Sequence, residues 1–208
     1  MKLLHTGDWH LNHIQGAVDR SEHLRRRVEK VAEICERESV DVLLHAGDWF
    51  SEQSQVNTRV NHVADSFTHL RRTFAPFFAR GGIILGVTGN HDQDGRIRPH
   101  IDVARAGMNI VSPSRRPGDH FTRGNFYLLD TFFHGRIRDE KEAFDVQLVL
   151  LPFPSLNRVL AGTETTSAAS ELNRSVAEAV SSRLRGLPEE PGFDRSLHSV
   201  LVAHIHAT

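Results

Sequence analysis

The chain is poor in cysteine, tyrosine and methionine, and it contains no long apolar run. Its one cysteine, Cys35, excludes a disulfide framework and a zinc site built on cysteines, and we expect it to pack on the apolar stripe of a helix. No apolar run approaches the roughly 20 residues of a membrane span. The first residues lead straight into polar chemistry at His5, which is unlike a signal peptide. These absences predict a cytoplasmic protein with no membrane partner.

The chain also lacks an excess of positive charge. Lys and Arg total 25 against 26 Asp and Glu, so the net charge is −1. No global field attracts nucleic acid, and a DNA partner would need local arginines or bound cations. With 39% apolar and 25% charged residues, the 208-residue chain has the composition of a globular domain. Histidine is the unusually frequent residue, with 14 copies.

Apolar runs alternate with amphipathic stretches in the first half of the sequence. Strands are predicted at 2–5, 40–46 and 82–87, and helices at 24–35 and 56–74. Two strand–helix–strand units of this kind predict an α/β fold, with a parallel sheet covered by helices.

The second half is less regular. We predict helices at 101–106 and 172–184, strands at 108–111, 126–131, 146–151 and 199–203, and solvated charged residues at 134–141. The chain stops just after the polar tip of the last strand, so we expect a single domain, 1–208, that is truncated at its C-terminal end. A complete domain is the alternative.

Polar tips beside glycines end three successive strands. They read Gly7-Asp8-Trp9-His10, Gly47-Asp48 and Gly89-Asn90-His91-Asp92. Neighbouring tips are about 40 residues apart, which is one strand–helix–strand period. Because parallel strands end at the same edge of a sheet, these tips should converge. A fourth strand should bring His204 to the same place.

Carboxylate, imidazole and amide ligands together suit Mn²⁺, Fe²⁺ or Zn²⁺. Their number indicates two ions, and Asp48, on the middle tip, is the candidate bridging ligand. Two such ions would clamp a phosphate, generate a hydroxide and stabilise the leaving oxygen. A single Asp after a strand is as well explained by a helix cap or a turn. All three tips in order favour the metal site.

The segments 5–11, 46–50 and 89–92 resemble the calcineurin-like metallophosphoesterase superfamily, and within it the SbcD-type DNA repair nucleases. The opening His5-Thr6-Gly7-Asp8-Trp9-His10 is the most specific part. The segment Leu151-Pro152-Phe153-Pro154, the long helix after it and the strand before His204 follow the same layout, so the resemblance covers essentially the whole chain.

The resemblance implies a role for each matching residue. Asp8 and His10 would bind one metal, Asp48 would bridge, and Asn90 and His204 would bind the second metal. The two residues that follow Asn90 would be catalytic. They are His91, which would contact the phosphate and protonate the leaving oxygen, and Asp92, which would orient His91.

The sequence departs from the family at its end, where a Gly-His-x-His motif normally serves both metals. One alignment takes Ala203-His204-Ile205-His206 as that motif, with His206 as a ligand. The other takes His204 as a single ligand and places the motif beyond Thr208. We favour the second, because the proline segment and the long helix come just before this strand.

Three functions compete. The resemblance implies an Mn²⁺-dependent DNA exonuclease and endonuclease of double-strand break repair, acting as a homodimer with an SbcC-type ATPase. A small-molecule phosphodiesterase or protein phosphatase of the same superfamily is the second hypothesis. A non-catalytic scaffold that binds DNA ends is the third. For His5 and His45 we expect supporting roles close to the ligands, and for Trp9 and Trp49 packing rather than stacking on a base.

Overall fold

The computed structural model describes residues 1–51, 62–93, 98–107, 116–139, 141–154 and 169–205. Its strands are β1 (Leu3–Thr6), β2 (Ile14–Gln15), β3 (Val18–Asp19), β4 (Val42–His45), β5 (Ile83–Val87), β6 (Phe126–Leu129), β7 (Phe133–Asp139), β8 (Phe144–Leu151) and β9 (His198–Ala203). Its helices are α1 (Ser21–Arg37), α2 (His62–Thr73), α3 (Ala75–Ala79), α4 (Arg98–Gly107) and α6 (Ala169–Gly186), with short 3₁₀ turns η2 (His91–Gln93) and η3 (Leu187–Glu189).

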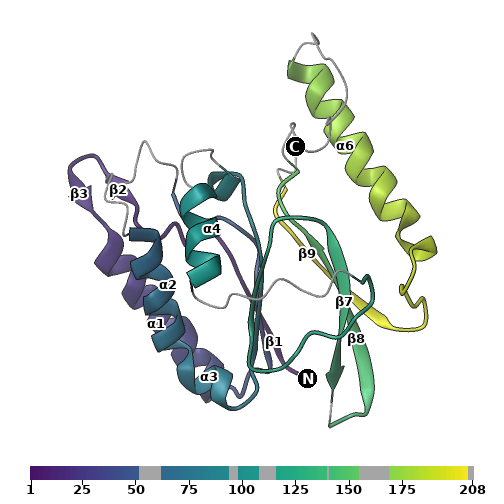
Figure 1. The fold of residues 1–208 in the computed structure, drawn as a ribbon, viewed down its shortest axis with the longest axis horizontal. Helices are drawn as coiled ribbons and strands as arrows, with labels where there is room; N and C mark the ends of the chain where they lie inside the picture. The colour runs from purple at the N-terminus through teal and green to yellow at the C-terminus, as the bar shows by residue number, and fades with distance from the viewer. Residues whose placement is uncertain (52–61, 94–97, 108–115, 140, 155–168, 206–208) are drawn as a thin grey trace.

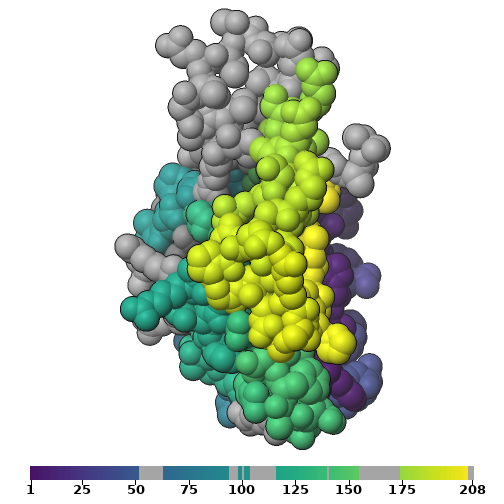
Figure 2. Space-filling model, turned by 90° about the vertical axis from the view of Figure 1, so that its right-hand side faces the viewer, coloured from purple at the N-terminus to yellow at the C-terminus, as the bar shows by residue number. Residues whose placement is uncertain are grey.

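Two sheets lie face to face between layers of helices (Figure 1). The first sheet has the order β1-β4-β5-β6 with every neighbouring pair parallel, and the second has the order β7-β8-β9. Helices α1 to α4 cover the outer face of the first sheet (Figure 1), and α6 lies outside the second (Figures 1 and 2). The predicted α/β class with a helix-covered parallel sheet is therefore confirmed.

Alternation along the central strands fills two cores. In β4, Leu43 points to the core shared with α1 and α2, while Val42 and Leu44 point to the core between the two sheets. The stripe that was predicted on α1 supplies Cys35, which is completely buried. Because both faces of β4 and β5 are covered, these strands are apolar except for the buried His45 at the end of β4.

The prediction of solvated residues at 134–141 was wrong. Strand β7 covers most of this segment and pairs with β8 in an antiparallel ladder. Gly135 and Ile137 are buried, and they alternate with Arg136 and Arg138, which are half-buried and exposed. The segment therefore has the two-residue period of a strand although it is rich in charge. The predicted strand 108–111 and the first part of the helix predicted at 56–74 lie outside the described residues.

Candidate metal centre

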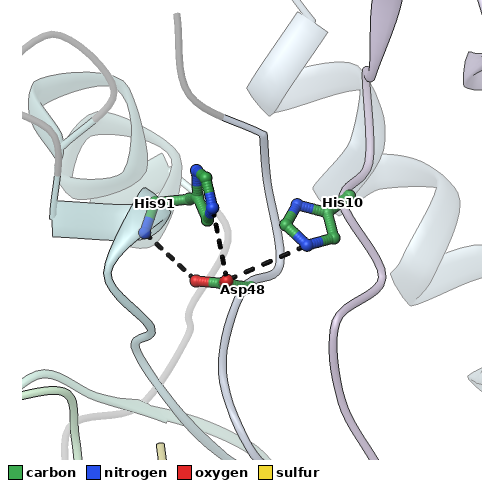
Figure 3. Close-up of side chains that lie close together, drawn as sticks. All are labelled: His10, Asp48 and His91. Atoms are coloured by element: carbon green, nitrogen blue, oxygen red, sulfur yellow. Dashed lines mark hydrogen bonds and ion pairs between the residues drawn. The ribbon is translucent and has the colours of Figure 1, made fainter. Parts of the chain in front are cut away.

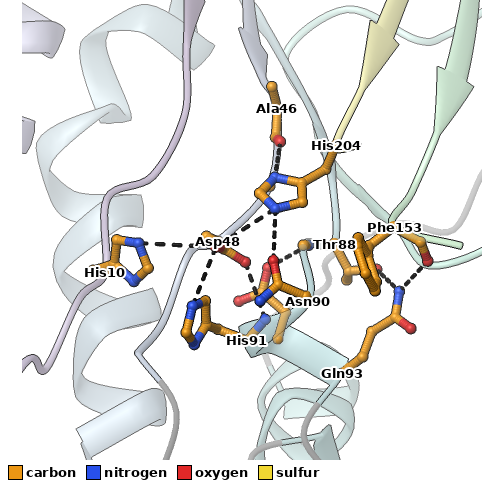
Figure 4. A network of polar contacts seen from close by, with 12 residues as sticks. His10, Ala46, Asp48, Thr88, Asn90, His91, Gln93, Phe153 and His204 are labelled. Atoms are coloured by element: carbon orange, nitrogen blue, oxygen red, sulfur yellow. Dashed lines mark hydrogen bonds and ion pairs between the residues drawn. The ribbon is translucent and has the colours of Figure 1, made fainter. Parts of the chain in front are cut away.

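The carboxylate of Asp48 lies among three imidazoles from distant parts of the chain (Figures 3 and 4). Its Oδ2 atom is 3.8 Å from Nε2 of His10 and 3.7 Å from Nε2 of His91. The Nε2 atom of His204 is 3.5 Å from the same oxygen. Asp48 is only 4% exposed, and its Oδ1 accepts the backbone N–H of His91 at 3.1 Å. One buried carboxylate thus faces three ring nitrogens.

The orientation of His204 places several lone pairs in the same small space. Its Nδ1 is 2.6 Å from the carbonyl oxygen of Ala46, and because a carbonyl only accepts, Nδ1 carries the proton. In the neutral ring Nε2 then has a lone pair, which faces Oδ1 of Asn90 at 2.9 Å as well as Asp48. Facing lone pairs repel one another, and a cation between them removes the conflict.

Asp8 belongs to the same cluster. Its carboxylate, that of Asp48 and the His204 ring offer ligand atoms that lie within 4.8 Å of one another, and His10, Asp48 and His91 form a second such set. Two ligands of one ion lie at most about 4 Å apart, which is twice a metal–ligand distance of ~2.1 Å. The separations around Asp48 satisfy this limit, so the donor set fits divalent ions.

Strained backbone holds the tips in place. Asp8, His10 and Asp48 have φ angles of 53°, 43° and 56°, in the left-handed region that costs a non-glycine residue about 1–3 kcal/mol. Strain of this kind persists where the surroundings impose it. Here the N–H of Asp8 donates to Gly47 at 3.0 Å, and the N–H of His10 donates to Asp48 at 3.0 Å. The first two tips are thereby fixed to each other by backbone hydrogen bonds.

Two glycines allow the tips to approach closely. A Cβ atom on Gly89 would be 2.0 Å from Oδ1 of Asp48, and one on Gly47 would be 2.6 Å from Nδ1 of His204. Gly47 also has a φ of +98°. Each glycine therefore provides space that a candidate ligand occupies, which explains its place beside the polar residue.

Asp92 makes buried hydrogen bonds that the sequence did not predict. It is 1% exposed, and its carboxylate accepts the backbone N–H groups of Gly89 (2.8 Å), Phe50 (3.0 Å) and Trp49 (3.2 Å). Burial raises the pKa of Asp92 to about 6, and the three N–H donors oppose that shift. These three hydrogen bonds tie the second tip to the third. That Asp92 also orients His91 stays a prediction.

His45 contacts the residues on either side of Asp48. It is completely buried, its ring stacks on Trp49 at 3.7 Å between centroids, and its Nδ1 accepts the N–H of Gly47 at 3.3 Å. Burial holds the pKa of His45 well below its usual value, and burial also lowers that of His10, so both rings favour the neutral form. Trp9 and Trp49 are buried, as the packing hypothesis predicted, whereas His5 is exposed.

Sequence reasoning did not single out His13. Its Nδ1 lies 2.9 Å from the hydroxyl of the buried Ser51, and its ring lies 6.5 Å from that of His10. Its position three residues after His10, a candidate ligand, could have indicated that His13 lies near the centre. His206 lies outside the described residues.

The calcineurin-like phosphoesterase family model matches residues 1–159. The chain belongs to this family. It is a metal-dependent phosphoesterase, and the candidate metal ligands around Asp48 are consistent with this activity. It is also 28% identical over 142 residues to a DNA double-strand break repair protein Mre11 from Methanopyrus kandleri, across 65% of this chain and 30% of that protein. The phosphoesterase chain thus spans less than a third of the length of this relative. None of the helices described in the structure is long and apolar enough to cross a bilayer.

Proposed function

We propose that the chain is a two-metal-dependent DNA nuclease of the SbcD type, which hydrolyses phosphodiester bonds in double-strand break repair and recombination. The observation that carries the proposal is the buried Asp48 carboxylate facing His10, His91 and His204. Family membership supports phosphoester hydrolysis. The opening segment 5–10 and the likeness to an Mre11 protein support DNA as the substrate.

The proposed ligand roles are those that the resemblance to the superfamily implies. Asp8 and His10 would hold one ion, Asn90 and His204 would hold the other, and Asp48 would bridge them. Mn²⁺ is the proposed metal, and Fe²⁺ and Zn²⁺ suit the same donors. Bound ions supply Lewis acidity and a nucleophile at neutral pH. Backbone hydrogen bonds between the strained tips hold the donor residues close together before any ion arrives.

His91 is the proposed proton donor. Its side chain is 26% exposed, and its backbone N–H is held by Asp48 at 3.1 Å, so the ring stays at the mouth of the centre. From there the imidazole can contact a phosphate oxygen and protonate the leaving sugar oxygen. A group in this role contributes about 10²–10⁴-fold in rate.

The wider assembly completes the proposal. We propose that residues 1–208 belong to one nuclease domain, which would work in the cytoplasm as a homodimer with an SbcC-type ATPase. His206 is a further ligand if its imidazole reaches the centre, which a His206→Ala variant would reveal as a loss of bound metal.

Two variants test the assignment. His91→Ala should retain the metal measured by elemental analysis yet lose DNA cleavage, whereas Asp48→Ala should lose both. His23→Ala, an exposed histidine on α1, is the matched control and should behave like the unaltered protein. Full cleavage by either site variant would contradict the proposal. Hydrolysis of a generic aryl phosphodiester without any cleavage of DNA would favour a small-molecule phosphodiesterase, and metal-independent DNA binding without hydrolysis of either would favour a scaffold.

A further inference from the structure

A cavity of about 470 Å³ opens between the loops that follow β6 and β8 and the inner side of α6. Its walls are largely apolar. They include Phe132, Pro152, Phe153, Pro154, Val180 and Arg183. The volume lies within the roughly 300–1,000 Å³ that is typical of small-molecule sites. Nothing described so far in the proposed reaction uses this space.

The cavity adjoins the metal centre along the same edge of the first sheet. Strand β6 lies beside β5, and adjacent strands are only about 4.8 Å apart. The N–H of Thr88, just before the third tip, donates to Leu129 at 2.9 Å, and the loop that follows Leu129 forms one wall of the cavity. The ends of β1, β4 and β5 carry Asp8, Asp48 and Asn90, and the cavity lies at the end of the neighbouring strand, β6.

Phe153 lies between the cavity and the metal centre. One side of it lines the cavity, and its ring centroid lies 6.0 Å from that of His204 (Figure 4). Its backbone is fixed from both sides, since its N–H donates to Thr88 at 2.9 Å and its carbonyl accepts from Gln93 at 2.7 Å. A ligand can thus occupy the cavity while its neighbouring group occupies the metal centre.

The walls suit a flat heteroaromatic ring. The guanidinium of Arg183 lies 4.5 Å over the ring of Phe132, and Glu190 holds the same guanidinium at 3.2 Å. Aromatic and guanidinium planes stack on nucleobases without regard to sequence. A base inside a duplex cannot reach such a cavity, because it is stacked between its neighbours and must first leave the stack.

We propose that this cavity receives an unpaired nucleobase of the DNA strand whose phosphate lies at the metal centre. The inference rests on the proposed nuclease function and deepens it, because it makes a frayed end or a single strand the favoured substrate. The base enters against Phe132 and Phe153, and its own phosphodiester then lies on the His204 side of Phe153.

Fluorescence of 2-aminopurine, which stacking quenches, tests the inference without a cleavage readout. Single-stranded oligonucleotides carrying one 2-aminopurine at successive positions are titrated with His91→Ala protein in Mn²⁺. Quenching should be strong at one position and weak elsewhere. Adding Phe132→Ala should abolish that position's quenching and weaken binding roughly 5- to 150-fold, which corresponds to the loss of one base stack.

Two further variants separate blocking from damage to the fold. Ala179→Trp adds bulk to the cavity from an exposed position on α6 and removes no contact, so it should also abolish the quenching. Phe144→Ala is the matched control, since this 39% exposed phenylalanine begins β8, roughly 23 Å from its cavity end. It should leave both the quenching and the affinity unchanged.

The outcomes distinguish this inference from the function on which it rests. If wild-type protein cleaves DNA but quenching is absent, or is equal in the Ala179→Trp and Phe144→Ala proteins, the cavity proposal alone is overturned. If wild-type protein neither binds nor cleaves DNA, both proposals are overturned. Faster cleavage of a duplex with mispaired ends than of a blunt one, with that preference lost in Ala179→Trp, supports the inference.

Discussion

Replacing Asp92 with alanine should destabilise the protein even without metal. The carboxylate is the buried acceptor for the N–H groups of Trp49, Phe50 and Gly89, and truncation leaves all three without it. A buried donor that loses its partner costs about 1–3 kcal/mol, and water entering the vacated space recovers part of this. We therefore expect a loss of about 3–5 kcal/mol. Domains have only about 5–15 kcal/mol in total.

Urea denaturation in the presence of EDTA measures this loss. Asp19→Ala is a suitable control, because Asp19 is exposed and accepts the N–H of Ser21 at 2.8 Å, and its loss should cost about 1 kcal/mol or less. If Asp92→Ala does not fold, Asp92→Asn, which keeps one acceptor oxygen, should show an intermediate loss. A denaturation midpoint unchanged from the wild type would refute the reasoning. It would favour a role for Asp92 that acts only through His91, which predicts lost turnover at full stability.

Three further predictions concern the tips and the opposite end of the first sheet. Gly89→Ala should lower metal affinity measured by calorimetry, because the new Cβ would lie 2.0 Å from Oδ1 of Asp48, whereas Gly186→Ala, which meets nothing within 4 Å, should leave it unchanged. Mn²⁺ at 100 times its Kd should stabilise the wild type by about 2.7 kcal/mol in thermal melts, and EDTA should reverse this; no shift would argue against a native metal site. The N-terminal ammonium of Met1 bonds to Asp139 and lowers the pKa of that carboxyl. Its contribution to stability is therefore present above about pH 4 and is lost as the pH falls through the lowered pKa, so wild type and Asp139→Ala should converge in acid denaturation series; a constant difference would contradict the pairing.

The convergence of the first three tips could be predicted because it depends on topology alone. Apolar strands separated by one helix each predict parallel pairing, and parallel strands end together. The pairs β1–β4 and β4–β5 are parallel, and Asp48 lies beside both His10 and His91. The spacing of the tips was sufficient to predict their convergence, because each of these strands pairs with the next strand of the same sheet along the chain.

Strand β7 escaped prediction because charge concealed its period. Arg136, Arg138 and Asp139 suggested solvation, yet Ile137 between the two arginines is buried, and β7 pairs with β8. One of the three, Asp139, is itself buried through its bond to the N-terminus, a contact between residues far apart in the sequence. Local composition cannot reveal such a partner.

Asp92 shows why a motif can identify a residue without revealing all of its contacts. The resemblance implies that Asp92 orients His91, and this stays a prediction. In the structure its carboxylate accepts the backbone N–H groups of Trp49 and Phe50, next to Asp48, which the sequence did not predict. His204 illustrates the converse, since it comes from the second sheet and meets Asp48 only because the two sheets face each other. The centre therefore depends on the apolar core between the sheets as much as on its ligands. Substitutions that loosen that core should lower metal affinity without touching a donor atom.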